Sequence, residues 1–341
     1  MSHGWRFVLV FFASVGLAQK AGLTTRADEQ LRQSVLPETT AAPTSPISAV
    51  PAEKYKLTFK FRLHQIVHQE ISYESEMTTH KNQDTQTVRN STKSKRHYRV
   101  TAVDDKTGVA DLDMTIDWVH MLASFDNGEG ERTEPIEFRS DDPKKQPKQF
   151  NDILASIGKR AWLRFSPAGA PVKTPSGAPP KTDAAAAPVT DGSLEAYLFP
   201  LPEQALAIGE IWKERFDVRM RDIDKQLVKI SLQRTYKLTE VKNGRAVIEL
   251  RTAILSSVQD PAIAAQLIQR EVTGKIVFDI EQGLIVSREW SVDNTIINPV
   301  GANSSMRAKS RYREKLLGSE ATADREGKIR PDDQPVATSK K

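Results

Sequence analysis

Two histidines with the spacing of a metal-binding pair, His64 and His68, stand in the first quarter of the chain. Residues four apart share one face of a helix, but the side chains around this pair alternate between apolar and polar, which predicts strands and a turn. In a strand the two histidines would lie roughly 13 Å apart. Because no third ligand is near them in the sequence, we predict no metal site here.

Two acidic stretches offer oxygen atoms to a cation. One covers residues 126–131, and the other consists of Asp104, Asp105, Asp111 and Asp113. Neither has the alternating oxygen ligands and closing glutamate of a calcium loop. Asp, Asn and Gly are also the residues that turns require, so we interpret both stretches as acidic turns.

The residue types of nucleophilic catalysis are absent or out of context. The chain has no Cys, no Ser in a Gly-x-Ser-x-Gly elbow, and no histidine beside Ser304 and Ser305. It also lacks a phosphate-binding loop and a dinucleotide fingerprint. We therefore predict no catalytic residue, no cofactor and no enzymatic activity. A pair of carboxylates of the glycosidase type leaves no local motif and stays open.

Four basic residues at alternate positions form what we call the basic stripe: Arg307, Lys309, Arg311 and Arg313. On a strand their side chains share one face. The favoured interpretation is a solvated strand face, where Lys and Arg also discourage edge-to-edge pairing. The alternative is a docking surface for an anionic polymer or lipid headgroups, and the stripe is the one candidate binding site that we assign.

The stripe belongs to a predicted hairpin that turns at residues 298–303. Glu289 and Asp293 occupy odd positions, as the stripe does, so a register with an even pair sum places acid opposite base. A sum near 600 would put Asp293 opposite Arg307 and Glu289 opposite Arg311.

Charge composition bears on the class of partner. The chain has 49 Lys and Arg against 44 Asp and Glu, a formal net charge of +5. This near balance lacks the concentrated positive field of a dedicated nucleic-acid binder, so we predict no nucleic-acid partner.

The elements that position these residues look duplicated. Residues 236–250 resemble residues 98–114. In each stretch an aromatic residue begins the first strand, a polar turn ends in Gly244 or Gly108, and a Gly-x-Ala pattern begins the second strand of the hairpin. The turns differ by two residues, which keeps every apolar side chain on its face. We predict a mainly β (β-rich α+β) fold, a duplicated antiparallel sheet or half-barrel with one short helix per repeat.

The second hairpin allows a specific register. We expect Leu238 opposite Ile248 and Tyr236 opposite Leu250, with a three-residue loop that ends in Gly244 at positive φ. A two-residue Asn-Gly turn would shift every pair by one.

The first β repeat is assigned to residues 53–172 and the second to residues 199–317. We expect helices at 150–157 and at 261–269, the latter with Asp260 as N-cap. Whether the repeats form one sheet or two separable domains stays open.

Two further segments of the first repeat have their own predictions. Strict alternation from Tyr55 to Leu63 predicts a half-buried strand. The polar and basic stretch from His80 to His97 predicts a long loop.

The ends of the chain and the middle carry segments outside the repeats. Residues 1–18 have a short basic start, an apolar run and small residues at 16 and 18, which predicts a cleaved signal peptide and export to the periplasm or the exterior. No later run is apolar enough to span a membrane. Low apolar content predicts a disordered tether at 19–52, a Pro/Ala-rich linker at 173–198 and a disordered tail at 318–341.

Several motifs together resemble a family of exported bacterial proteins of unknown function, a domain-of-unknown-function type. They are Leu201-Pro-Glu, Ile208-Gly-Glu-Ile-Trp212, Arg234-Thr-Tyr-x-Leu, Gly274-Lys-Ile-Val-Phe278-Asp and Ser304-Ser-Met-Arg. The resemblance covers most of the second repeat and, more loosely, the first. It implies export and an antiparallel β fold, and no catalytic residue. By looser analogy, the fold is similar to the lipoprotein-carrier half-barrels of the periplasm.

These observations together predict an exported, non-enzymatic envelope protein that binds an apolar ligand or lipid on a curved β-sheet. The alternative is a structural or protein-interaction module of the cell envelope without a small-molecule site. The identity of the ligand or partner stays open.

Overall fold

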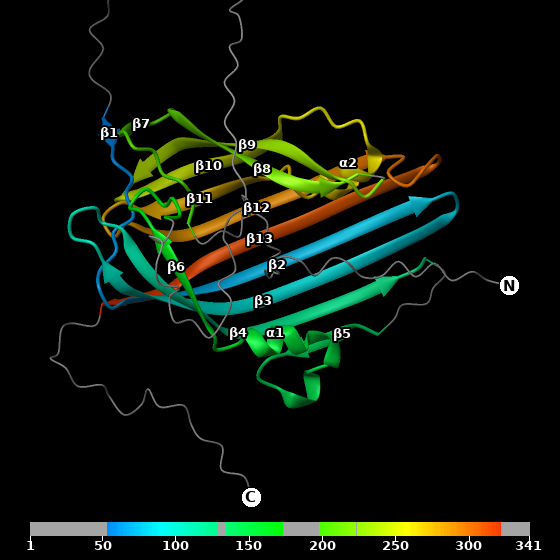
Figure 1. The fold of residues 1–341 in the computed structure, drawn as a ribbon, viewed down its shortest axis with the longest axis horizontal. Coiled ribbons are helices and arrows are strands. Elements are labelled where there is room, and N and C mark those ends of the chain that lie inside the picture. The colour runs from blue at the N-terminus through cyan, green and yellow to red at the C-terminus, as the bar shows by residue number, and fades with distance from the viewer. Residues whose placement is uncertain (1–52, 129–133, 173–197, 223, 322–341) are drawn as a thin grey trace, which may run out of the picture.

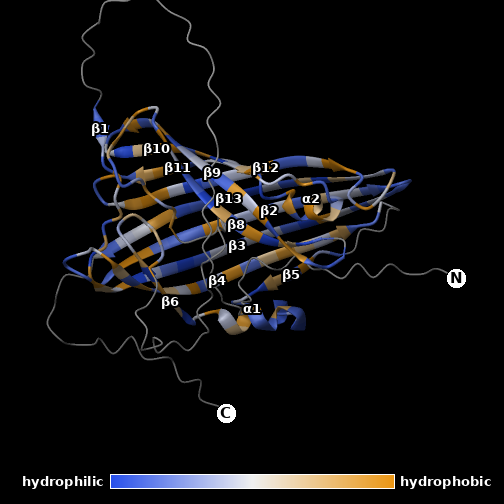
Figure 2. Ribbon diagram, turned by 45° about the horizontal axis from the view of Figure 1, so that its top comes forward, coloured by the Kyte–Doolittle hydropathy of each residue, from blue (hydrophilic) through white to orange (hydrophobic). Residues whose placement is uncertain are grey.

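A single large antiparallel sheet dominates the fold. The computed structural model describes residues 53–128, 134–172, 198–222 and 224–321, and the predicted signal peptide, tether and most of the linker and tail lie outside them. The long strands form because apolar and polar side chains alternate, which Figure 2 shows as hydrophobic and hydrophilic bands. The prediction of a mainly β fold with an antiparallel sheet is confirmed.

The sheet contains eleven strands in the order β5-β4-β3-β2-β13-β12-β11-β10-β9-β8, with β6 paired to β4 (Figure 1). Their bounds are β2 (Gln65–Lys81), β3 (Asp84–Val103), β4 (Ala110–Asp126), β5 (Ile136–Arg139), β6 (Arg160–Phe165), β8 (Ile211–Arg221), β9 (Leu227–Lys242), β10 (Arg245–Ile254), β11 (Thr273–Asp279), β12 (Leu284–Ile297) and β13 (Ser304–Ala321). A separate small sheet pairs β1 (Lys54–Tyr55) with β7 (Leu206–Ala207).

The helices are short. They are η1 (Pro143–Lys145), η2 (Lys148–Phe150), α1 (Asn151–Ser156) and α2 (Pro261–Leu267). Both α-helices lie where the sequence predicts them, and Asp260 caps α2 by accepting a hydrogen bond from the Ala262 amide at 2.7 Å. Within the described ranges, no helix combines the length and the apolar character that a membrane crossing requires.

One continuous sheet joins the two halves of the chain. Strands β2 and β13 pair along their whole length, from Ser304 opposite Lys81 to Ala321 opposite Gln65. This pairing settles the open alternative in favour of one sheet.

The order of elements also recurs. Strands β2, β3 and β4 are followed by α1 and then β6, which pairs with β4; strands β8, β9 and β10 are followed by α2 and then β11, which pairs with β10. Tyr98 and Tyr236 are both buried, and Gly108 and Gly244 have φ of 68° and 72°. A duplication predicts this recurrence, and superposition of the two halves would test it.

The predicted loop from His80 to His97 is wrong. Almost all of it belongs to β3, and the only turn lies at Asn82, whose φ is 57°. The stretch contains few apolar residues because its inward positions include the small polar Asn90, Thr92 and Ser94, and its outward positions include the charged Arg89, Lys93 and Lys95. Arg96 is a charged residue on the inward side, where it is buried. Hydrogen bonding to β2 and β4 on both sides stabilises the strand without an apolar stripe.

The predicted strand from Tyr55 to Leu63 is also corrected. Only Lys54–Tyr55 is strand, and the extended residues 56–62 pack on the sheet instead of pairing in it. The Phe59 amide donates to Pro167 O at 2.9 Å and the Lys60 amide to Gly283 O at 3.3 Å, so this inner segment contacts both halves. Its alternation reflects which side chains face the core: Leu57 and Phe59 are almost completely buried.

The last strand is longer than predicted. β13 ends at Ala321, four residues beyond the assigned end of the second repeat, because residues 318–321 continue to pair with β2. The remainder of the predicted tail lies outside the described residues.

The β9–β10 hairpin has the predicted register with a different turn. Leu238 pairs with Ile248 and Tyr236 with Leu250, as expected. The turn, however, is the two-residue Asn243-Gly244 type with positive φ at both residues. A β-bulge at Thr239 absorbs the extra residue, so the tight turn and the expected register coexist.

The β12–β13 hairpin has the predicted parity but a register shifted by two residues. Asp293 lies opposite Lys309, and Glu289 opposite Arg313. The ion pairs are nevertheless the expected ones, because the long arginine side chains reach diagonally: Arg307 Nε lies 2.9 Å from Asp293 Oδ1, and Arg311 Nη2 lies 3.8 Å from Glu289 Oε2.

Candidate functional site

The sheet has an apolar face, which we call the inner face, and a charged outer face. The main core lies at one end of the inner face, where the inner segment and the stretch around Phe199 pack on the sheet. In this core, the ring of Phe59 contacts the rings of Phe199 and Phe278 edge to face. α1 covers the inner face of β4, and α2 covers that of β8 and β9. Figure 1 shows the two helices near opposite edges of the sheet.

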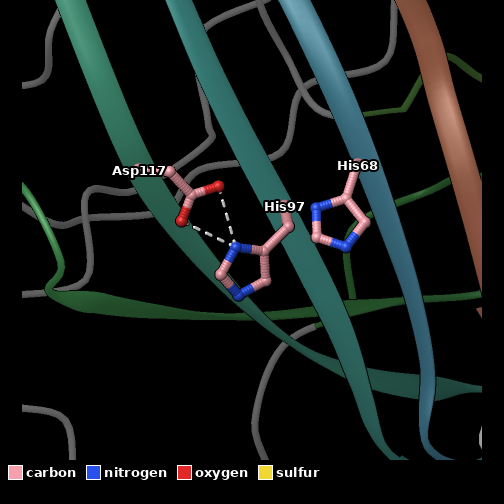
Figure 3. Close-up of side chains that lie close together, drawn as sticks. All are labelled: His68, His97 and Asp117. Atoms are coloured by element: carbon pink, nitrogen blue, oxygen red, sulfur yellow. Dashed lines mark hydrogen bonds and ion pairs between the residues drawn. The ribbon is translucent and has the colours of Figure 1, made fainter. Parts of the chain in front are cut away.

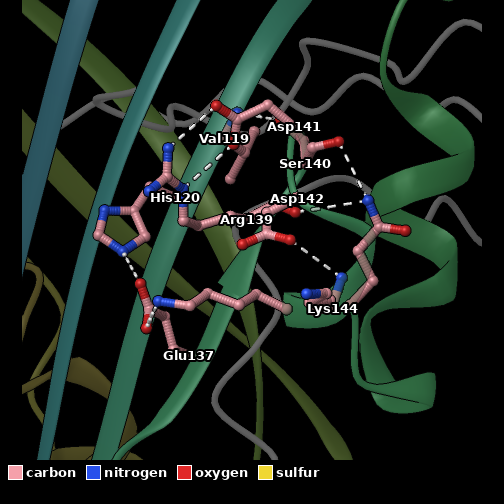
Figure 4. A network of polar contacts seen from close by, with 10 residues as sticks. Val119, His120, Glu137, Arg139, Ser140, Asp141, Asp142 and Lys144 are labelled. Atoms are coloured by element: carbon pink, nitrogen blue, oxygen red, sulfur yellow. Dashed lines mark hydrogen bonds and ion pairs between the residues drawn. The ribbon is translucent and has the colours of Figure 1, made fainter.

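A polar network holds the α1 region against β4 (Figure 4). The Val119 amide donates to Ser140 Oγ at 3.0 Å, and Lys145 Nζ donates to Glu137 Oε2 at 2.5 Å. His120 Nε2 lies 3.0 Å from Glu137 Oε1. The hydrogen bond from Lys145 holds the pKa of Glu137 below its ordinary value, so this carboxylate stays charged near neutral pH.

The segment after α2 crosses over the inner face toward the centre of the sheet. Asn294 Nδ2 donates to Ile268 O at 3.0 Å, and Tyr73 Oη donates to Gln269 Oε1 at 3.5 Å. These contacts place Ile268 and Gln269 over β12 and β2.

Between the two helices lies a half-buried band of the inner face, which we call the central band. It is built around Ser75, whose register partners are Asn90 on β3 and Ser310 on β13. Rows of inward-facing side chains flank the row of Ser75 on both sides. They include Ile71, Tyr73 and Met77 of β2, which are half-buried.

Stacked aromatic rings border the central band. Trp290 and Tyr312 are parallel within 5°, with ring centroids 5.2 Å apart, and Tyr73 lies 5.9 Å from Trp290. Trp290 and Tyr312 are nearly completely buried, whereas Tyr73 retains exposed surface. The stacked rings therefore form a rigid apolar border beside the small Ser75 and Ser310 side chains, and Tyr73 is the ring of the three that keeps exposed surface.

Polar atoms in and beside the central band are buried without a partner. Asn90 Oδ1, Ser310 Oγ and Trp290 Nε1 accept or donate no hydrogen bond within the described part of the chain. Ser310 and Trp290 are each only 6% exposed. A buried polar atom without a partner costs about 1–3 kcal/mol, so the site favours a group that supplies those hydrogen bonds.

A charged network is buried next to the band. Glu314 accepts hydrogen bonds from Arg288 Nη2 at 2.5 Å, Tyr312 Oη at 2.7 Å, Gln69 Nε2 at 2.9 Å and Arg96 Nη2 at 3.2 Å. Burial alone would raise the pKa of Glu314, but the two guanidinium groups outweigh it and hold the pKa below its ordinary value. Sequence reasoning missed this network, although a glutamate at an inward position of an alternating strand was a signal for it.

The basic stripe lies on the outer face, where acids surround it. Lys309 faces Asp293 on β12 and Glu76 on β2, and Arg311 faces Glu74 on β2. Arg313 ends a row that crosses five strands with alternating charge: Lys237, Glu249, Lys275, Glu289 and Arg313. The outer face therefore carries rows of alternating charge across its strands, an arrangement that we call the charge ladder. The basic stripe is the part of the charge ladder that lies along β13.

A shallow groove of ≈ 710 Å³ lies on this outer face and extends from Ile211 at the start of β8 to Arg311 on β13. Its walls include both signs of the charge ladder, with Lys275 between Glu249 and Glu289. The groove therefore offers no concentrated charge of one sign to a partner.

The prediction of two acidic turns holds only in part: Asp104 and Asp105 lie in a turn and Asp126 ends β4 before one, whereas Asp111 and Asp113 lie within β4, and residues 129–131 lie outside the described residues. Asp104 Oδ1 accepts hydrogen bonds from the amides of Lys106 and Thr107 at 3.0 and 2.8 Å, and the Thr107 amide bond holds the pKa of Asp104 below its ordinary value. Asp126 Oδ1 accepts from the Gly128 amide at 3.0 Å. These oxygens serve the backbone of their own turns.

The structure separates the predicted histidine pair and forms another cluster. His64 lies in the turn before β2 with φ of 65°, whereas His68 lies within β2, directly opposite His97 of β3. His97 Nδ1 in turn lies 2.8 Å from Asp117 Oδ1 of β4 (Figure 3). A search along the sequence misses this cluster because its members are neighbours across strands.

Comparison with known proteins gives no family. No family model matches the chain, and no curated protein matches it. Among solved structures, the chain is similar to one described as "lipid-protein interactions in lipovitellin", with 12% identity and a TM-score of 0.43. The match covers 78% of this chain and 26% of that one, so the chain spans about a quarter of that protein's length.

Proposed function

We propose that this chain is an exported, non-enzymatic envelope protein that binds an apolar ligand or lipid on the inner face of its curved sheet. The observation that supports the proposal is the central band, where half-buried apolar side chains adjoin buried polar atoms that lack partners among the described residues. This combination matches an amphiphile, whose apolar part and polar group require different surroundings.

The chemistry of the band defines the ligand class. Ile71, Tyr73 and Met77 offer apolar contact to an alkyl or ring system. Trp290 Nε1 is a donor and Asn90 Oδ1 an acceptor, so the polar group of the ligand would both accept and donate hydrogen bonds. Methionine adapts to ligands of varied shape, which favours a class of lipids over one rigid compound.

Direct chemical analysis tests the proposal. Native mass spectrometry and solvent extraction of the purified protein should reveal a bound apolar compound, and the apolar dye 1-N-phenylnaphthylamine should bind the lipid-free protein and be displaced by the extract. Repeated preparations without a ligand, together with no dye binding, would contradict the proposal. They would favour a structural or protein-interaction module of the envelope.

A matched pair of variants locates the binding face. Met77→Glu introduces a charge on the inner face, whereas Thr78→Glu introduces it on the outer face opposite Arg307. We expect Met77→Glu to weaken dye binding at least tenfold and Thr78→Glu to leave it within about twofold, because burying an unpaired carboxylate against a lipid is unfavourable. Equal effects of both variants would place the ligand elsewhere.

A further inference from the structure

We propose that His68, His97 and Asp117 form a binding site for a divalent transition-metal ion of the Zn²⁺ class on the outer face of the sheet. One ligand atom from each residue lies within 4.8 Å of the other two. Figure 3 shows the three side chains on neighbouring strands with His97 between the other two. This site is independent of the central band, which lies on the opposite face.

The sheet positions the two imidazole groups. His68 and His97 are direct register partners on β2 and β3, so their side chains leave the sheet on the same side. Their ring centroids are 5.5 Å apart. Both residues are half-buried, which limits the motion of their rings.

A β-bulge supplies the carboxylate. On β4, Ile116 pairs with Arg96 and Trp118 with Lys95, so Asp117 is the extra residue between them. Bulges commonly redirect a side chain at a functional position. Here the bulge gives Asp117 access to His97, whose Nδ1 lies 2.8 Å and 2.9 Å from its two carboxylate oxygens.

The donor set selects the kind of ion. Imidazole nitrogen favours Zn²⁺, Cu²⁺, Ni²⁺ and Fe²⁺, whereas Mg²⁺ and Ca²⁺ prefer oxygen ligands. Two histidines and one carboxylate provide three protein ligands and leave a fourth position for water or another molecule. Tetrahedral ligands at about 2.0–2.2 Å from the metal lie roughly 3.3 Å apart, so modest side-chain rotations would close the site.

The surroundings allow an ion to enter. Asp117 is exposed, and the residue opposite His68 on β13 is Gly318, which has no side chain and has open space above its Cα. Lys95 and Arg99 flank His97 on β3, and their positive charge favours moderate rather than very tight binding.

Isothermal titration of the purified, chelator-treated protein with Zn²⁺ alone tests the site, and Co²⁺ absorption reports its coordination geometry. We expect one ion per chain at micromolar Zn²⁺ and a rise in melting temperature with added metal. His68→Ala and His97→Ala should each lower the affinity at least tenfold, and so should Asp117→Asn. His64→Ala and His80→Ala are matched controls that should bind as the parent does.

The alternative is that Asp117 and His97 form only a surface ion pair beside His68. In that case the parent would bind no Zn²⁺ below about millimolar concentration, or the site variants would bind as tightly as the controls, and either result would overturn the proposal. Circular dichroism of each variant checks that its sheet is intact. If binding persists in Asp117→Asn but not in the histidine variants, Asp117 positions His97 rather than binding the ion, and a three-ligand site is wrong.

Discussion

Glu314 is a charged residue that the structure buries almost completely. It is 2% exposed and accepts hydrogen bonds from residues on β12, β13, β2 and β3. Replacing it leaves the buried guanidinium groups of Arg96 and Arg288 without this carboxylate, which is far costlier than removing a whole buried ion pair together with its partners.

Glu314→Gln should therefore lower the free energy of unfolding by about 3–5 kcal/mol, measured by urea denaturation. Glu289→Gln is the matched control on the outer face, where the side chain is 52% exposed and lies 3.8 Å from Arg311. Its effect should stay within about 1 kcal/mol, because exposed ion pairs contribute little. Similar small losses for both variants would contradict the assigned role of Glu314.

The same residue predicts a pH dependence. Its folded-state pKa lies below the ordinary 4.5, so the unfolded chain takes up a proton first as the pH falls. The stabilisation is fully present above about pH 4.5 and decreases as the pH falls through the folded pKa. Stability measured between pH 3 and 6 should therefore fall less steeply in Glu314→Gln than in the parent, and parallel curves would exclude this linkage.

At the scale of the residue, the sequence predicts which face of the sheet a side chain occupies, but not which side chains are its neighbours on the adjacent strands. The parity of the basic stripe and the burial of Tyr98 and Tyr236 follow from alternation alone. The cluster of His68, His97 and Asp117 depends on a strand pairing and on one bulge, and neither leaves a local signal in a polar strand.

At the scale of the element, strand register is set by bulges and turns acting together. The Asn243-Gly244 turn and the bulge at Thr239 together produce the pairing that the apolar pattern requires, and Thr239 Oγ1 donates to Val247 O at 3.2 Å in the bulge. β12 and β13 lack such a constraint in the sequence, which is why their parity was predictable and their register was not.

Charge reversal in the basic stripe tests the charge ladder. Lys309→Glu would place a carboxylate between Asp293 and Glu76, whereas Arg313→Glu would face only one acid, Glu289. Like charges directly opposite cost roughly 0.2–1 kcal/mol per pair, so Lys309→Glu should lower stability more than Arg313→Glu. The difference should shrink at about 1 M salt, where the Debye length is about 3 Å.

The same two variants bear on the predicted anionic surface. If the stripe docks lipid headgroups, both reversals should abolish retention on anionic liposomes at about 0.15 M salt. Retention that survives both reversals, or that the parent lacks, would leave the stripe as a solvated strand face and exclude it as a docking surface.

At the scale of the whole molecule, three features link the two halves. Strands β2 and β13 pair along their whole length, the inner segment donates hydrogen bonds to Pro167 and Gly283, and the Glu314 network crosses from β12 to β3. The repeats were visible in the sequence as separate patterns. Their union in one sheet was not, because the pairing of the first long strand with the last depends on contacts some 240 residues apart along the chain.

One sheet with a shared network predicts one cooperative unit. Differential scanning calorimetry should give a single endotherm whose calorimetric and van't Hoff enthalpies agree, because neither half can unfold without exposing a long unpaired strand edge in the other. Glu314→Gln should move the whole endotherm to lower temperature, since its partners lie in both halves. Two endotherms, of which the variant shifts only one, would mean that the halves are separable and that the β2–β13 junction contributes little to their stability.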